Sequence, residues 1–215
     1  MISGALKISK MSGKLEGIKA INTNTLTNLF CAAMHKKEKT ICAECYSINM
    51  LQTFRKNCAA AWQINSDILS AGIIEPDLLP RFKSDDTVRF HGHGELLDNA
   101  DGSNARGYNN NYHFKNFIQI AAINPDTFFT LWTKRREIVN AVLDSGAALP
   151  GNLSLIYSNP ATNHLSRLPR HFDKTFNVIT VDQKENFSVN CSGRCANCMA
   201  CYSRNNIETI IEVIK

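Results

Sequence analysis

The sequence predicts an α/β protein with a mainly parallel sheet, arranged as a partial (βα) barrel or as an open sheet. From about residue 87 onward, segments rich in β-branched and aromatic residues alternate with helical segments of ten or more residues. Strands separated in this way are joined by crossovers, which favours parallel pairing. The chain has 215 residues, whereas a closed eight-unit barrel needs about 250. We therefore expect one domain over residues 1–215, with cysteine-rich metal-binding segments at 31–45 and 191–201.

The first half of the chain is predicted to contain two strands and two helices. Residues 5–9 are consistent with a first strand, and Thr25 or Thr27 is expected to cap a short helix. Residues 47–71 contain no Gly or Pro and place apolar side chains at helical spacing, which predicts one long helix. The run Thr87-Val-Arg-Phe-His91 predicts a buried strand.

The second half of the chain continues the alternation of helix and strand. The predicted elements are a helix at residues 112–123, a strand at 127–132, a helix at 135–144 and strands at 153–157 and 176–181. Ligands bind at the carboxyl ends of parallel strands, so the polar segments that follow these strands are candidates for a site. The Gly- and Asn-rich stretch 92–111 is long enough to be a functional loop.

Composition and charge limit the classes of function. The chain has 24 Lys and Arg against 19 Asp and Glu, a net charge of +5 that permits a nucleic acid or an anionic small molecule as a partner. The amino terminus has no apolar leader, and no run reaches the roughly 18 apolar residues of a membrane span. We therefore expect a cytoplasmic protein without membrane contact. Thiols are kept reduced there, so spaced cysteines indicate metal or catalytic sites before disulfides.

The C-terminal cysteines have the spacing of a metal cluster. Cys191, Cys195, Cys198 and Cys201 are separated by three, two and two residues. Short intervals of this kind wrap four thiolates around one compact cluster, and small residues between the ligands let the backbone approach the sulfur atoms. The alternative is a four-Cys zinc site, although zinc more often takes two Cys pairs separated by a longer insert. We expect a 4Fe-4S cluster here.

A second group consists of Cys31, Cys42 and Cys45, without an obvious fourth cysteine. A 4Fe-4S cluster held by three thiolates leaves one iron open to another ligand, which is a catalytic arrangement. The alternative is a zinc site of three Cys and one His, because His35 lies one helical turn after Cys31. Cys58 has apolar neighbours in the predicted long helix and is expected to be a small buried side chain.

A Gly-x-Gly-Glu sequence directly follows the predicted strand at 87–91. Gly92 and Gly94 allow bare backbone to approach a ligand, and the carboxylate of Glu95 can accept from an ammonium or hydroxyl group. The alternative is a simple turn. Lys134, which follows the predicted strand at 127–132, is a candidate for binding a ligand carboxylate or phosphate, or is a solvated residue at a helix start.

The order of these features resembles the radical S-adenosylmethionine (SAM) superfamily: a three-Cys site, a strand that ends in a Gly-Glu turn, and further βα units. In that superfamily the open iron chelates the amino and carboxylate groups of SAM, and the Gly-Glu turn meets the amino group. The resemblance implies that Cys31, Cys42 and Cys45 hold the catalytic cluster. It also implies that Gly92, Gly94 and Glu95 contact SAM.

The whole chain also resembles a family of small phage proteins described as "gene product 88". The matching stretches are Met11-Ser-Gly-Lys-Leu-Glu-Gly17, Ile41-Cys-Ala-Glu-Cys-Tyr46, Leu131-Trp-Thr-Lys-Arg135 and Cys198-Met-Ala-Cys-Tyr-Ser203. The resemblance extends nearly from end to end. For a phage protein the expected location is the host cell cytoplasm.

Three functional hypotheses follow from these patterns. The first is a radical-SAM-like enzyme with one or two 4Fe-4S clusters, SAM as the small-molecule cofactor and an unidentified substrate. The second is a binding protein, braced by zinc or by inert clusters, that engages a host protein or a nucleic acid. The third is a redox or electron-transfer module. Cluster and cofactor supply the chemistry of the first hypothesis, while the protein orients and shields it.

Overall fold

One sheet runs through the computed structural model, which describes residues 5–97 and 110–214. Its seven strands lie in the same order in space as in the chain. The first two strands pair antiparallel and every later pair is parallel. The strands are β1 (Ile8–Lys10), β2 (Lys19–Ile21), β3 (Thr87–Phe90), β4 (Phe128–Thr133), β5 (Leu153–Thr162), β6 (Lys174–Thr180) and β7 (Thr209–Ile214). Because β1 and β7 do not pair within the described residues, the sheet is open, and the predicted open, mainly parallel α/β architecture is confirmed.

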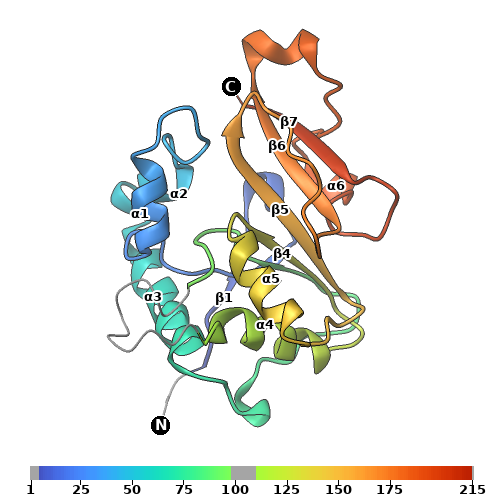
Figure 1. The fold of residues 1–215 in the computed structure, drawn as a ribbon. Helices are drawn as coiled ribbons and strands as arrows, with labels where there is room; N and C mark the ends of the chain where they lie inside the picture. The colour runs from blue at the N-terminus through green and yellow to red at the C-terminus, as the bar shows by residue number, and fades with distance from the viewer. Residues whose placement is uncertain (1–4, 98–109, 215) are drawn as a thin grey trace.

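The helices lie in the crossovers between the strands (Figure 1). They are α1 (Leu29–His35), α2 (Tyr46–Gln52), α3 (Lys56–Ala71), α4 (Tyr112–Ala122), α5 (Arg136–Asp144) and α6 (Cys195–Cys198), with short 3-10 turns at Gly13–Leu15, Pro76–Leu78 and Val181–Asn186. The first three helices connect β2 to β3, and α6 lies between β6 and β7. Each group of cysteines therefore occupies a crossover, one near each end of the parallel part of the sheet.

The larger core lies between one face of the sheet and helices α3, α4 and α5. Phe90 of β3 stacks on Phe117 of α4 and on Phe129 of β4, with ring centroids 4.0 and 5.1 Å apart. All three rings are fully buried. Aromatic side chains bury large apolar areas and contribute strongly to core stability, so this stack holds the central strands against the helical layer.

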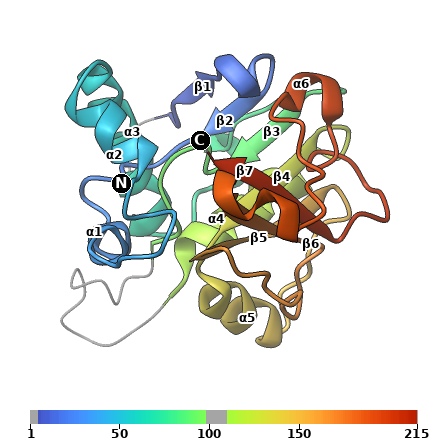
Figure 2. The same cartoon turned by 90° about the horizontal axis from the view of Figure 1, so that it is seen from above.

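The opposite face of the sheet carries a second core. Trp132 follows the first-core residue Leu131 in β4, so its side chain points to the other side, where it packs on Phe176 of β6 with ring centroids 4.8 Å apart. Cys201 and Tyr202 complete this cluster. Figure 2 shows α6 and α5 on opposite sides of the central strands. The C-terminal cysteine segment therefore packs directly on the sheet.

The prediction of one long helix at residues 47–71 was wrong, because the chain forms two helices there. α2 ends when Thr53 leaves helical geometry, with φ −111° and ψ −89°. The N–H of Arg55 donates to the carbonyl oxygen of Met50 at 3.0 Å, which closes the turn before α3 begins. No Gly or Pro marks this break, so the periodicity of apolar residues continued across it.

Other differences concern short elements. The cap of α1 is Asn28, and neither Thr25 nor Thr27 occupies that position. The strands β2 and β7 were not predicted. Three residues, the length of β2, are too few for a period of two to be visible. Within the described residues, no helix is long and apolar enough to cross a membrane.

Candidate metal and cofactor sites

Cys31 lies in the first turn of α1. Its backbone N–H donates to the side-chain oxygen of Asn28 at 3.1 Å, which caps the helix. The amide nitrogen of the buried Asn28 side chain donates in turn to the carbonyl oxygen of Glu95, also at 3.1 Å. One asparagine therefore fixes the start of α1, and with it Cys31, against the loop that follows β3.

The loop that carries Cys42 and Cys45 is tied to β5. The N–H of Ile41 donates to the carbonyl oxygen of Pro160 at 2.9 Å. Nδ1 of His35 lies 2.8 Å from the carbonyl oxygen of Cys42, and because a carbonyl only accepts, Nδ1 carries the proton and donates. His35 thus braces the loop through one nitrogen, and a zinc site would have to use the other nitrogen, Nε2.

The structure brings Cys31, Cys42 and Cys45 together with Glu95 and Lys134. Burial raises the pKa of the Cys31 thiol and the charge of Glu95 adds to the rise, while Lys134 opposes it. The pKa of Cys42 is raised by burial, again with opposition from Lys134. Because the net shift is upward, both thiols are protonated at neutral pH, and a bound metal ion would favour their thiolate form. The five side chains share one electrostatic neighbourhood of the kind found at functional sites.

Glu95 is almost fully buried, and three donors hold its carboxylate. The hydroxyl of Thr133 and the N–H of Leu96, the latter at 2.8 Å, donate to Oε1. The N–H of Lys134 donates to Oε2 at 2.8 Å. Burial raises the pKa of Glu95, and the charge of Lys134 and these hydrogen bonds oppose the rise. Because a carboxylate can accept about four hydrogen bonds, there is capacity for one more donor such as an ammonium group.

Lys134 is the cation of this site and is partly buried. Its Nζ donates to the hydroxyl of Ser158 in β5 at 3.3 Å. Burial alone would lower the pKa of Lys134, but the thiols of the site and the carboxylate of Glu95 outweigh it and raise the pKa. The ammonium group therefore stays charged. Residues from β5 and from the loops after β3 and β4 thus meet at one place, as expected for parallel strands.

The two glycines of the Gly-x-Gly-Glu turn approach the chain itself. A Cβ atom on Gly92 would lie 2.8 Å from Oδ1 of Asn22, and one on Gly94 would lie 2.5 Å from the carbonyl oxygen of Thr23. Both partners follow β2 directly. The two glycines thus allow the turn to pack closely against the end of β2. A ligand at this turn would therefore contact the turn backbone and Glu95. Residues 98–109 of the predicted loop lie outside the described residues.

A pair of buried histidines stands behind Glu95. The N–H of Leu97 donates to Nδ1 of His113 at 3.0 Å, so neutral His113 carries its proton on Nε2. That proton faces Nε2 of His91 at 3.3 Å, so neutral His91 carries its proton on Nδ1. This Nδ1 has no hydrogen-bond partner among the described residues and lies 4.0 Å from Oε1 of Glu95. His91 also has a left-handed backbone, with φ 63°, which is uncommon outside glycine.

The histidine pair predicts that acid destabilises the folded chain. Burial lowers the pKa of His113 to about 3 and that of His91 well below its usual value, whereas an unfolded histidine titrates near pH 6.5. Between these values the unfolded chain binds more protons. The free energy of unfolding should therefore fall as the pH drops below about 6.5, by up to about 1.4 kcal/mol per pH unit for each histidine.

Urea unfolding at pH 7 and pH 5 measures this effect. The variant His113→Gln should show a shallower pH dependence than the wild type, because one of the two buried groups is gone. The same slope in both proteins would show that His113 is not buried in its neutral form.

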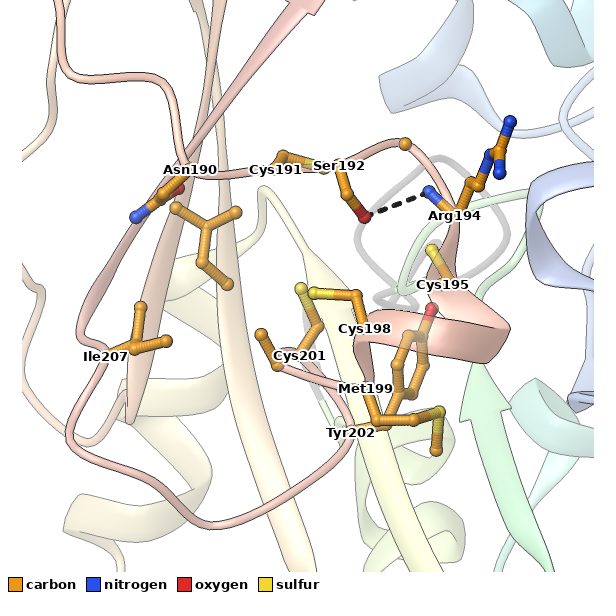
Figure 3. Close-up of a pocket in the computed structure, with 13 residues that line it drawn as sticks. Asn190, Cys191, Ser192, Arg194, Cys195, Cys198, Met199, Cys201, Tyr202 and Ile207 are labelled. Carbon is orange, nitrogen blue, oxygen red and sulfur yellow. Dashed lines mark hydrogen bonds between the residues drawn. The ribbon is translucent and has the colours of Figure 1, made fainter.

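The four C-terminal cysteines line one cavity. Figure 3 shows the loop of Cys191 passing over α6, whose two ends are Cys195 and Cys198. Met199 ends this helix in a left-handed conformation, with φ 50°, and the chain turns back so that Cys201 faces the same space. The predicted group of four is therefore brought together by local turns.

The electrostatics of the C-terminal site resemble those of the N-terminal site. Burial raises the pKa of Cys201 to about 12, and the neighbouring thiols add to the rise. The charge of Arg89 opposes it. Arg89 was not singled out in the sequence, although an arginine between the buried residues Val88 and Phe90 of a strand is itself a recognisable signal.

All eight cysteines are free thiols. Cys58 packs against the cluster of Met50, Leu51 and Trp62, but it is partly exposed and not buried as predicted. In the part of the chain that the structure describes, no group of three or more His, Cys, Asp or Glu side chains is spaced to hold a single metal ion.

Thiols in a group of three and a group of four are donors of the type used by both zinc sites and iron-sulfur clusters. Zinc draws its sulfur ligands to about 2.3 Å from one centre, whereas a 4Fe-4S cube places its own iron and sulfide atoms between its thiolates. The four C-terminal cysteines line one cavity, and Cys31 lies within electrostatic reach of Cys42 and Cys45.

Comparison of the chain with protein-family models, with curated proteins and with solved structures gives no match. The fold and the sites define its class instead. It is an open, mainly parallel α/β protein with two groups of cysteines. One group lies near the carboxyl ends of the central strands, and the other lies on the sheet face opposite to helices α3, α4 and α5.

Proposed function

We propose that the chain is an iron-sulfur protein that acts as a radical-SAM-like enzyme and belongs with the phage "gene product 88" family. The main support is the gathering of three partly buried thiols with Glu95 and Lys134 beside the carboxyl ends of β3 and β4. The consecutive order of the parallel strands β2 to β7 is also the order of a partial (βα) barrel.

In this proposal Cys31, Cys42 and Cys45 hold a 4Fe-4S cluster with one open iron. Glu95 has capacity for one further hydrogen bond and accepts it from the amino group of SAM. The ammonium group of Lys134 pairs with the carboxylate of SAM. When bound, the cluster and SAM supply one-electron chemistry that generates an organic radical. The chain contributes a buried, hydrogen-bonded carboxylate and a partly buried cation.

The four C-terminal cysteines hold a second 4Fe-4S cluster in this proposal. Four thiolates satisfy all four irons of a cube, so no iron is open to a substrate or to SAM. Its position on the second core gives this cluster a structural or redox role. The two sites therefore differ in function because they differ in the number of cysteines.

Anaerobic purification followed by electron paramagnetic resonance (EPR) tests the proposal. We expect a brown protein with about eight irons per chain and a reduced spectrum that changes when SAM is added. About four irons without a response to SAM would indicate a redox or structural protein. Stoichiometric zinc in a colourless protein would exclude radical chemistry and favour a metal-braced binding protein.

A matched pair of variants controls this experiment. Lys134→Gln removes the partly buried cation and should weaken SAM binding about tenfold, which corresponds to about 1.4 kcal/mol, while the iron content stays unchanged. Arg136→Gln removes an exposed cation two positions later and should leave both quantities unchanged. Equal effects of the two substitutions would argue against a specific contact with Lys134.

A further inference from the structure

Arg89 lies on the sheet face that carries the C-terminal cysteines. Its guanidinium carbon is 4.0 Å from the centroid of the Trp132 ring, a cation–π contact. Nη1 donates to the hydroxyl of Tyr202 at 3.1 Å, and Nε donates to the carbonyl oxygen of His91 at 3.1 Å. Three contacts on different segments therefore hold the guanidinium group in one place.

In the part of the chain that the structure describes, the charge of Arg89 has no carboxylate partner. Among the described residues, no ion pair joins Arg89 to Asp or Glu. Trp132, which the guanidinium group contacts, belongs to the same apolar cluster as Cys201, and Cys195 packs against that cluster. A partly buried cation normally requires a compensating anion, and here thiolates would supply it.

The position of Tyr202 links the arginine to the cysteines. Tyr202 directly follows Cys201 and is buried, with 3% of its surface exposed. Its hydroxyl accepts the hydrogen bond from Arg89. Because Tyr202 is covalently joined to Cys201, this hydrogen bond limits how far the guanidinium group can lie from the cysteine segment. Lysine would keep the charge but would not reproduce the flat stacking on Trp132 together with two donated hydrogen bonds.

We propose that Arg89 is the counterion of the C-terminal site, where it positions the cysteine segment and raises the reduction potential of the metal cluster bound there. This inference rests on the proposed function, in which residues 191–201 hold a 4Fe-4S cluster. Reduction adds one electron, and hence one negative charge, to a site that already carries four thiolates. A fixed positive charge nearby stabilises the reduced state more than the oxidised state, and this difference raises the potential.

The test is a redox titration of the full-length chain with dithionite as the reductant, followed by EPR. Cys42→Ala is included as the background so that only the C-terminal cluster is observed. Arg89→Met, which removes the charge and keeps most of the apolar stem, should shift the midpoint potential to a more negative value. Arg89→Lys should stay close to the background protein, because it keeps the charge.

Arg204→Met is the matched control, since it removes an exposed arginine that donates to the carbonyl oxygen of Gly151. It should leave the potential unchanged because solvent screens an exposed charge. An unchanged potential in Arg89→Met, or an equal shift in Arg89→Met and Arg89→Lys, would overturn the role of the charge. If Arg89→Met does not retain iron, Arg89→Gln replaces it in the titration.

Iron analysis separates the two levels of the proposal. If the Cys42→Ala background holds no iron, the cluster assignment and the role of Arg89 both fail. If it holds about four irons and only the predicted shift is missing, the role of Arg89 fails while the cluster assignment stands.

Discussion

Substitution of Cys42 by alanine is expected to remove about half of the iron from the protein, from about eight to about four atoms per chain. The remaining cysteines of that site, Cys31 and Cys45, would leave a cube with only two thiolates. Cys195→Ala should remove the other half by the same reasoning. Iron and acid-labile sulfide, measured after anaerobic purification, give the two numbers directly.

Cys58→Ala is the control for these two variants. Cys58 packs among apolar side chains at the α2–α3 contact, so its loss should leave the iron content unchanged. Loss of all the iron in either variant would contradict the assignment of two separate clusters. Full retention of iron in Cys42→Ala would remove the open-cluster assignment, and with it the site proposed for SAM.

The largest effect on stability is expected for Gly94→Ala. The added Cβ would lie 2.5 Å from the carbonyl oxygen of Thr23, and the glycine has φ +89°, which alanine rarely adopts. The clash involves backbone on both sides, so neither partner can move without disturbing the end of β2. We expect a loss of about 3 kcal/mol or more in the free energy of unfolding, measured by denaturant titration.

Gly146→Ala isolates the steric part of that loss. Gly146 has nearly the same backbone angle, φ +93°, but a Cβ there would meet nothing within 4 Å. It should cost only about 1 kcal/mol, which is the penalty of the left-handed conformation. Similar losses at the two positions would show that the turn around Gly94 can move away from Thr23.

The result also bears on the candidate site, because Gly94 directly precedes Glu95. The close packing of the turn against Asn22 and Thr23 determines the position of the Glu95 carboxylate relative to Thr133 and Lys134. A Gly94→Ala protein that still folds should therefore show a weaker response to SAM than its iron content predicts.

Much of the fold is visible in the sequence where the elements are long and strongly patterned. The strand at Thr87–Phe90 and the helices α4 and α5 lie within two residues of their predicted bounds. The short strand β2 was missed because its pairing with β3 defines it more than its own composition does. The break between α2 and α3 was missed because backbone hydrogen bonds at Arg55 close it, and no breaking residue marks the position.

The two cysteine groups show where local pattern ends and long-range structure begins. The spacing of Cys191, Cys195, Cys198 and Cys201 is read directly from the chain, because gaps of two or three residues are closed by single turns and the rest of the fold is not needed to bring the sulfur atoms together. The alternation of strands and helices is equally local, since it depends on which side chains can be buried together. Both features follow from the order of the residues alone.

Distant residues meet only because the parallel sheet aligns its strands in a particular register. Cys31 reaches Glu95 and Lys134 because a crossover and two strand ends lie side by side, and Arg89 reaches Tyr202 across a separation of 113 residues. No short-range pattern encodes such a contact, because its energy comes from packing and hydrogen bonds that exist only when the whole sheet has formed. The sequence therefore determines the spacing of the cysteines, and the folded sheet determines which distant residues lie beside them.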